Sequence, residues 1–307
     1  MPVRLLLSFV ALAATWGASF LFMRLGAADF GPIPTASMRV TLAAVFLLPA
    51  LLIPAIRRDF TKRAGHILFV GLLNSGVPFA FFAFAVMHIS TSLTAILNAT
   101  VPLTGAIVAW AWLHERPDNS RILGLLIGLL GVVLLVSARS SGAIGPGQGG
   151  DEHPWLPLLS MAACIAATVC YAFAASFTKK YLQGIHPLST TTGSLIGASL
   201  GLAIPAYLTW PAVTPSANAW AAIAAVAILC TSLAYILFFH IINTAGPAKA
   251  LTVTFLVPVF ALFYGVTFLK EQITPWMVIC GLVIVSGTVL ATGLWKIQAL
   301  NRRNAAA

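Results

Sequence analysis

The chain has 307 residues, of which 60% are hydrophobic and 8% are charged, and its formal net charge is +10. Because soluble domains carry about 25% charged residues, this composition excludes a soluble globular protein and indicates that lipid surrounds most of the chain. The basic residues are divided among short loops between apolar stretches and form no aromatic and basic stripe, so nucleic acid is not an expected partner.

Ten apolar segments are long enough to cross a membrane, which takes roughly 20 helical residues. The first begins like a signal peptide, with Arg4 before an apolar run, but it continues to Leu25, whereas a signal core has about 7–15 residues. We therefore expect it to be retained. In chain order, the predicted membrane helices run over residues 5–25, 33–56, 65–87, 91–113, 120–138, 155–178, 188–209, 218–242, 248–269 and 275–296. The sequence thus predicts an all-α membrane protein.

One connection between these helices is long. Residues 139–154 read RSSGAIGPGQGGDEHP, a Gly- and Ser-rich composition that is typical of a flexible linker. The linker falls at the midpoint of the ten segments. We therefore expect a first repeat over residues 1–138, and a second repeat over residues 155–307 that ends in a cytoplasmic tail.

The two halves contain related segments. Residues 102–115 read PLTGAIVAWAWLHE and residues 258–271 read PVFALFYGVTFLKE, so a proline, an apolar helix and Leu-X-Glu recur 156 residues apart. Such duplicated sets of apolar helices are typical of transporters built from two repeats around a central site. Because each half has five helices, the second enters the membrane from the opposite side. The sequence predicts two inverted five-helix repeats around a central cavity, an arrangement that permits alternating access.

The Lys and Arg residues predict the orientation. With ten spans and a cytoplasmic N-terminus, thirteen of the seventeen fall on the cytoplasmic side. The four on the opposite side are Arg24, Arg39, Arg139 and Lys270. Because cytoplasmic loops of membrane proteins carry the excess of basic residues, we expect both termini to be cytoplasmic.

Short motifs in both halves match one family. They are Trp16-Gly17, Phe20, Pro102 through Glu115-Arg116-Pro117, Gly124, Gly128, Gly131, Pro258 through Glu271, Gly281 and Gly287. Over essentially its whole length the chain resembles the EamA family of the drug/metabolite transporter superfamily, and within it the bacterial amino-acid and aromatic-amino-acid exporters. The second copy departs from the family pattern, because Gln272 replaces the arginine of the first copy and Tyr171 falls where Trp16 stands.

The resemblance implies a ten-helix carrier of the bacterial inner (plasma) membrane. We expect it to export small metabolites, foremost neutral or aromatic amino acids, by alternating access. A drug exporter is an alternative, as is an exchanger of phosphorylated or nucleotide sugars, which needs clustered basic residues facing the cavity. Most of the nearby basic residues are expected at the interface, so a neutral or zwitterionic solute fits better: Arg24, Arg39, Lys179, Lys180 and Lys249. A channel, the rival class, needs a filter of carbonyls or charges that the sequence does not display.

An enzyme is not expected. The sequence contains no HExxH, GxSxG or P-loop motif and no paired intramembrane aspartates. The cysteines are interpreted as small core residues, since they form no CxxC and have no neighbouring histidine: Cys164, Cys170, Cys230 and Cys280. We therefore expect no cofactor and no metal. The expected partners are a small-molecule substrate and the lipid bilayer, with the protein as a monomer.

No carboxylate is predicted in the middle of a span. Lys270, Glu271 and Glu115 are interpreted as charges at helix ends that orient the spans. Because ionisable groups inside the hydrocarbon usually mark function, their absence argues against proton antiport through a buried carboxylate. Facilitated movement down a gradient is the simpler hypothesis.

The candidate substrate-binding residues are polar and aromatic groups inside the spans. Asn98 maps onto Thr254 at the repeat offset, and Thr94 lies on the same helix face as Asn98. Pro102 and Pro258 are expected to kink their helices and free a carbonyl, with a packing kink as the alternative. Each polar residue also has an alternative role in joining helices. The candidates are Trp16, Ser19, Asn74, Phe79, Phe82, Thr94, Asn98, Tyr171, Ser232, Tyr235, Thr254 and Phe255.

Overall fold

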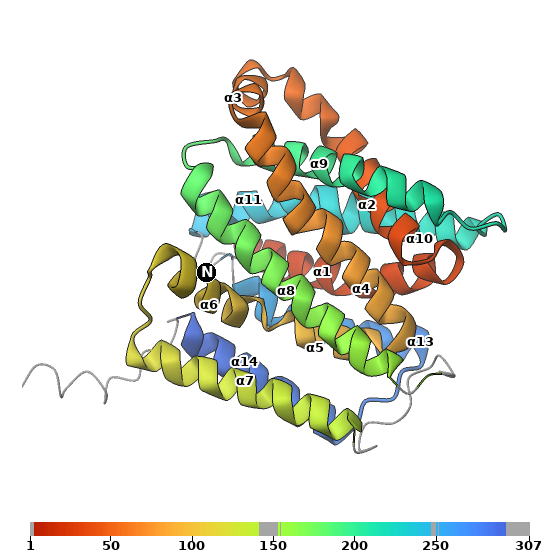
Figure 1. Cartoon of the computed structure of the whole chain (residues 1–307), viewed down its shortest axis with the longest axis vertical. Coiled ribbons are helices and arrows are strands. Elements are labelled where there is room, and N and C mark those ends of the chain that lie inside the picture. Colours follow the sequence, from red (N-terminus) through yellow and green to blue (C-terminus); the bar gives the residue numbers. More distant parts are fainter. Residues whose placement is uncertain (1–2, 141–152, 154, 247–249, 251, 293–307) are drawn as a thin grey trace, which may run out of the picture.

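The computed structural model describes residues 3–140, 153, 155–246, 250 and 252–292, and within these ranges it is helical without strands (Figure 1). Most of the linker, Lys249 and the C-terminal tail lie outside the described residues. The first half contains α1 (Val3–Phe30), α2 (Pro32–Leu47), η1 (Leu48–Leu52), α3 (Pro54–Gly71), η2 (Leu72–Gly76), α4 (Val77–His88), α5 (Thr91–Asn98), α6 (Val101–Leu113) and α7 (Asn119–Ser140).

The second half follows the same order. Its elements are α8 (Leu156–Tyr181), α9 (Pro187–Leu208), α10 (Ala217–Ala227), η3 (Ile228–Leu233), α11 (Ala234–Ala245), η4 (Thr252–Phe255), α13 (Val257–Leu269) and α14 (Pro275–Ala291). Nine helical stretches of the described chain are long and apolar enough to cross a membrane, and α14 is a shorter apolar helix. The predicted all-α membrane fold with ten segments is confirmed.

The predicted break between the second and third spans is wrong at both sides, since the third span was predicted to begin only at residue 65. The second span was predicted to end at residue 56, but the helical run ends at Leu52 and α3 already begins at Pro54. Ile53 between them is extended, with φ −73° and ψ 118°. A residue that precedes proline is disfavoured in the α conformation, so Pro54, rather than the basic residues after it, sets the break.

Two of the predicted spans are discontinuous helices. In the first half, α5 ends at Asn98 and α6 begins at Val101; in the second, the 3-10 turn η4 precedes α13. Pro102 and Pro258 each occupy the second position of the helix that restarts. Proline is tolerated there because the N–H that it lacks would have no intrahelical partner. The expected kink therefore takes the form of a helix break.

Local irregularities recur at the offset of the sequence duplication. The π-helical turns η2 and η3 begin at Leu72 and Ile228, 156 residues apart. His114 and Lys270, also 156 residues apart, are the two non-glycine residues with positive φ in the described chain. The duplication thus extends from sequence to backbone conformation.

The pair α7 and α14 packs by direct backbone contact. A Cβ atom on Gly124 would lie 2.4 Å from the Ala291 nitrogen, and one on Gly287 would lie 2.3 Å from the Gly128 nitrogen. Small residues allow membrane helices to approach this closely. The two helices run side by side along the lower edge of the molecule (Figure 1).

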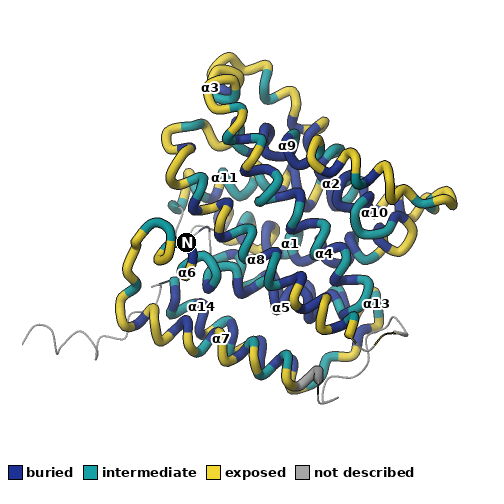
Figure 2. The backbone as a smooth tube through the Cα atoms, in the orientation of Figure 1, coloured by how far each residue is buried: buried dark blue, intermediate teal, exposed yellow. Residues whose placement is uncertain are grey.

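Buried residues gather in the middle of the helix bundle around α1, α4 and α5, and exposed residues follow the outer faces of peripheral helices such as α7 and α9 (Figure 2). Many of the exposed side chains are large and apolar, as lipid contact requires, among them Leu126, Leu200 and Leu282. The core cluster that contains Phe20, Phe82 and Val257 joins helices of both halves.

Candidate functional site

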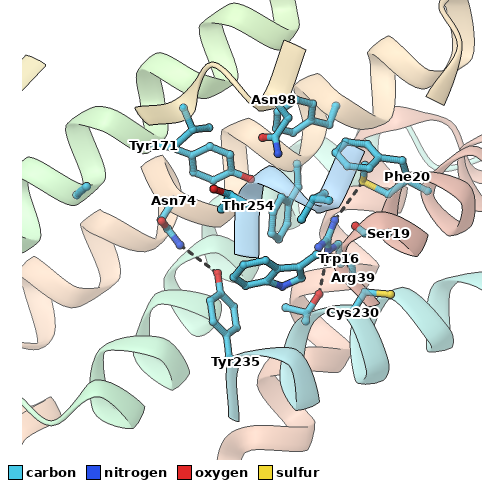
Figure 3. A pocket seen from close by; sticks show the side chains of 17 residues that line it. Trp16, Ser19, Phe20, Arg39, Asn74, Asn98, Tyr171, Cys230, Tyr235 and Thr254 are labelled. Atoms are coloured by element: carbon cyan, nitrogen blue, oxygen red, sulfur yellow. Dashed lines mark hydrogen bonds between the residues drawn. The ribbon is translucent and has the colours of Figure 1, made fainter. Parts of the chain in front are cut away.

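A cavity of about 310 Å³ lies between the two halves. Its walls come from α1, α2, α4, α8 and α11, from both π turns and from the broken helices α5–α6 and η4–α13. Figure 3 shows the lining side chains, which are Trp16, Ser19, Phe20, Met23, Arg39, Asn74, Phe79, Phe82, Asn98, Val101, Tyr171, Ala175, Cys230, Thr231, Tyr235, Thr254 and Val257.

The structure brings nine of the twelve candidate residues together at this cavity. They are Trp16, Ser19, Asn74, Phe79, Phe82, Asn98, Tyr171, Tyr235 and Thr254. Phe255 is half-buried and is not among the lining residues. Thr94 and Ser232 are fully buried away from the cavity, and backbone carbonyls accept the hydrogen bonds of their hydroxyl groups.

The contacts of these two residues explain their absence. The Thr94 hydroxyl donates to the Ser90 carbonyl at 3.0 Å, one turn back in the chain. The Ser232 hydroxyl is within hydrogen-bond distance of the Ala227 carbonyl at 3.1 Å and the Ala43 carbonyl at 3.2 Å. Small hydroxyl side chains commonly bond to nearby backbone carbonyls in this way, and here they join helices instead of facing a ligand.

The two halves supply equivalent positions to the cavity. Six pairs of lining residues are related by the repeat offset of 156 residues or, in the first helices, of 155: Asn74 and Cys230, Phe79 and Tyr235, Asn98 and Thr254, Val101 and Val257, Trp16 and Tyr171, and Phe20 and Ala175. The cavity is therefore built from two copies of one half-site.

Polar groups enter the cavity where the helices are irregular. Asn74 lies in the π turn η2, and its Nδ2 donates to the Tyr235 hydroxyl of the other half at 3.4 Å (Figure 3). Asn98 is the last residue of α5, and its side chain makes no hydrogen bond to another described residue. Turns of π-helix and helix breaks are common at functional sites, because they leave polar groups free to meet a ligand.

Aromatic rings form much of the cavity wall. The rings of Phe20 and Phe82 meet edge to face with centroids 5.9 Å apart, and Phe82 stacks on Tyr171 at 6.1 Å. Trp16 packs against Phe238, with ring centroids 5.2 Å apart. These contacts hold the rings in fixed orientations, which suits a site for a flat or apolar substrate group.

The cavity contains one residue that was wrongly placed from the sequence. Arg39 was counted with the charges at the membrane interface, but it lies halfway along α2 and only 5% of it is exposed. Its position inside the predicted span 33–56 was an available signal, because a charged residue within the hydrocarbon costs about 2.5–3.5 kcal/mol on insertion scales and usually has a function.

Neutral groups surround the guanidinium of Arg39. Its Nε donates to Thr231 Oγ1 at 3.0 Å, its Nη1 approaches Met23 Sδ at 3.2 Å, and its central carbon lies 3.7 Å from the centre of the Phe79 ring. Thr231 can accept because its own proton is directed to the Val226 carbonyl, five residues back across the π turn. The second half has no arginine at the position equivalent to Arg39. Residue 194, at the offset of 155 that relates the first helices, is a serine.

The comparisons with known proteins cover nearly the whole chain. The model of the EamA-like transporter family matches residues 4–137 and 158–293. The uncharacterized transporter YoaV of Bacillus subtilis is 22% identical, with 94% of this chain and 97% of YoaV covered. The uncharacterized inner membrane transporter YedA of Escherichia coli K12 is 23% identical, with 92% and 88% covered.

A crystal structure of another protein shares the fold. Its TM-score is 0.62 at 20% sequence identity, and the match covers 96% of this chain and 98% of that one. The family match has the same two-part pattern as the duplication, since it contains one segment in each half of the chain. The protein belongs to the EamA-like transporter family and is a multi-pass membrane transporter.

Proposed function

We propose that the protein exports small metabolites, foremost amino acids with neutral or aromatic side chains, across the bacterial inner membrane by alternating access. The observation that carries this proposal is the cavity between the two halves, to which each half contributes the same six positions. A site assembled from two equivalent half-sites can be exposed from either end when one repeat moves against the other.

Inverted repeats and cytoplasmic termini are part of the proposal. The Lys and Arg distribution supports this orientation, and relatives from Escherichia coli are named as inner membrane transporters. With five helices in each repeat, the orientation requires that the two halves traverse the membrane in opposite senses.

The cavity suits an amino acid better than the alternatives. Its aromatic walls accept an apolar side chain, and α5 ends in it at Asn98, so the negative end of the helix dipole is directed at a substrate ammonium group. A nucleotide sugar needs several basic partners, whereas Arg39 is the one basic residue among the described lining side chains. The same charge opposes a cationic drug.

The test is counterflow in proteoliposomes. Vesicles preloaded with unlabelled L-phenylalanine should accumulate labelled L-phenylalanine transiently and saturably, which a channel would not produce. The folded variants Trp16→Ala and Asn98→Ala should transport it more slowly, because both residues line the cavity. Absence of counterflow for a panel of amino acids, with counterflow of another metabolite class, would overturn the proposed substrate class.

Facilitated transport is proposed as the energetic mode. The described lining residues include no carboxylate that a proton could load and unload. Net transport of L-phenylalanine across vesicles with an imposed proton gradient should therefore continue at an unchanged initial rate after a protonophore collapses that gradient. A rate that drops when the gradient is collapsed would show coupling and contradict this part of the proposal.

A further inference from the structure

The charge of Arg39 is not balanced by any described acidic residue. The five described carboxylates have other partners: Asp29 accepts from Ser216, Asp59 from His186, Asp118 from Arg121, Glu115 pairs with Lys179, and Glu271 accepts from Thr91 and Ser92. A cation that is 95% buried needs a compensating charge, because neutral contacts alone replace only part of its hydration.

The guanidinium is held in place but not saturated. Thr231 orients Nε, the face of Phe79 supports the plane, and the thioether of Met23 is a weak acceptor for Nη1. Nη2 makes no hydrogen bond to any described residue. The edge formed by Nη1 and Nη2 therefore remains for a planar partner that can accept two parallel hydrogen bonds.

We infer that Arg39 binds the carboxylate of the transported solute, so that the substrates are small monocarboxylates with an apolar or aromatic body. This inference rests on the proposed transport function, and it concerns the same cavity. A carboxylate matches the guanidinium in charge and in its two-pronged geometry, and the rings beside it accept the rest of the solute (Figure 3).

The single charge selects among anions. A phosphate monoester carries about −1.5 to −2 charges near neutral pH, so one guanidinium leaves part of that charge unpaired in the cavity. The other described lining groups are amides, hydroxyls, a thiol and apolar side chains, and none of them adds a second positive charge. A substrate with one carboxylate is fully neutralised by Arg39.

Arg39 also has no equivalent in the other half-site. The lining residues paired by the repeat offset are neutral in both halves, and α9 contributes none of the described lining residues. The carboxylate of the solute is thereby directed toward α2 in one defined orientation, while the aromatic walls are shared by the two halves.

The experiment compares an acid with its neutral amide on the purified full-length protein. Calorimetric titration in detergent uses 3-phenylpropionate, 3-phenylpropanamide, L-phenylalanine and phenyl phosphate. Of these, 3-phenylpropionate differs from its amide only in the charged carboxylate, while the rest of the molecule is kept. The wild-type protein should bind 3-phenylpropionate on the order of 10- to 100-fold more tightly than the amide, the size expected for hydrogen bonds to a charged group.

Variants locate the effect. In Arg39→Gln, 3-phenylpropionate and L-phenylalanine should bind no more tightly than the amide, and binding of the amide should be unchanged. Arg39→Lys should recover part of the preference for the acids, because it restores the charge without the planar fork. The matched control is Arg24→Gln. Arg24 is a half-buried arginine of α1 that donates to the Val86 carbonyl and is not among the lining residues, so this variant should keep the wild-type preference.

The comparison of acid and amide binding by the wild-type protein tests the inference even if a variant does not fold. Equal binding of acid and amide, a preference that survives in Arg39→Gln, tighter binding of phenyl phosphate, or no binding of any probe at millimolar concentration would overturn it. An Arg39-dependent preference for acids without amino-acid counterflow would retain the carboxylate site and reject the proposed amino-acid export. Counterflow of L-phenylalanine that Arg39→Gln leaves unchanged would retain the export and reject the site.

Discussion

The helices α6 and α13 occupy the same place in the two repeats and end in the same backbone turn, at opposite ends of the α7–α14 pair (Figure 1). His114 and Lys270 follow them with φ of 57° and 55°. The next residue is a glutamate in both, and its N–H donates to the carbonyl six residues earlier, at 3.3 Å for Glu115 and 3.0 Å for Glu271. This left-handed helix end is common in proteins. The side chains of the two glutamates, however, have different partners.

Glu271 is buried, with 7% of its surface exposed, and it binds the start of α5. Its two carboxylate oxygens accept from the N–H groups of Thr91 and Ser92 at 2.6 and 3.1 Å, and from their hydroxyls at 2.9 and 2.6 Å. A carboxylate at a helix N-terminus satisfies N–H groups that have no partner within the helix and interacts favourably with the helix dipole. We call Glu271, Thr91 and Ser92 the Glu271 clasp, which joins the second repeat to the first.

Glu115 has a solvent-exposed partner instead. It pairs with Lys179 at the end of α8, and the two side chains are 46% and 57% exposed. Exposed ion pairs are typically worth about 0–1 kcal/mol, because water screens them and two long side chains lose freedom. This end of the molecule is therefore fastened much less firmly than the end with the Glu271 clasp.

Three substitutions between the repeats explain the difference. Gly265 leaves room for the Glu271 carboxylate, since a Cβ atom there would lie 2.4 Å from Oε2, whereas Ala109 stands at the equivalent position of the first repeat. Thr91 and Ser92 correspond at the offset to Pro247 and Ala248, which have no hydroxyl and, for proline, no N–H. Equivalent backbones thus carry different side-chain contacts at the two ends, and in the proposed alternating-access cycle these contacts would favour closure at the α13 end.

The largest effect is expected for Glu271→Gln. Glutamine keeps the size of the side chain, but an NH2 group replaces one of the two carboxylate oxygens. At least two of the N–H and hydroxyl groups of Thr91 and Ser92 therefore lose their hydrogen-bond acceptor. We expect a loss of about 3 kcal/mol in the free energy of unfolding in detergent. The α13 end should also open more often, so that maleimide alkylates Cys230 in the cavity faster.

Peptide mapping separates Cys230 from the other three cysteines, and a Cys230→Ser background provides the control for that signal. An unchanged unfolding free energy together with an unchanged rate of alkylation at Cys230 would show that the Glu271 clasp does not hold this end closed.

The next effect is expected for Gly265→Ala. The added methyl group overlaps the Glu271 carboxylate and lies 2.7 Å from Ser92 Oγ, so the clasp must shift. Overpacking of this kind costs about 1–3 kcal/mol, which exceeds the gain of roughly 0.5–1 kcal/mol from replacing a helical glycine by alanine. Thermal unfolding in detergent should show a net destabilisation.

The matched variant Ala109→Gly exchanges the same two residues in the other repeat. It should lose only the helix preference of alanine, because Glu115, the equivalent of Glu271, pairs with the exposed Lys179 instead, and it should not change alkylation of Cys230. Stabilisation by Gly265→Ala would contradict the packing of the clasp.

The asymmetry of the ends shows how far sequence reasoning reaches in this protein. The apolar segments and the duplicated Leu-X-Glu predicted ten helices and the equivalence of Glu115 and Glu271, because helix length and repetition are local properties of the sequence. Whether a glutamate at a helix end is buried depends on residues 180 positions away, at the start of α5. Glu271 was accordingly predicted as a charge at a helix end without its partners.

The cavity shows the same limit. Seven of the nine candidates that reach it are aromatic or amide residues, and such side chains in the middle of apolar helices have few other places to lie. Thr94 and Ser232 do not reach the cavity, since a hydroxyl can bond to its own helix and the sequence does not reveal which choice it makes. Arg39 was missed because the count of basic residues by side of the membrane treats every arginine as part of a loop.

A smaller effect is expected for Ser92→Ala, which removes one hydroxyl donor and keeps the backbone N–H. The variant should lose about 1 kcal/mol of unfolding free energy, the usual value for one hydrogen bond. Ser286→Ala is the control, because that exposed hydroxyl donates only to the Val283 carbonyl of its own helix. Equal stability of both variants would mean that the hydroxyl of Ser92 contributes nothing to the Glu271 clasp.

The smallest effect is expected at the other end, for Lys179→Met. This variant keeps the apolar part of the side chain and removes the charge that pairs with Glu115. The loss should be below about 0.5 kcal/mol, and a double-mutant cycle with Glu115→Gln should give a coupling energy of similar size that decreases at high salt. A coupling as large as the loss in Glu271→Gln would mean that the two ends are equally fastened. The substitutions at Gly265, Thr91 and Ser92 would then not bias the transporter toward closure at the α13 end.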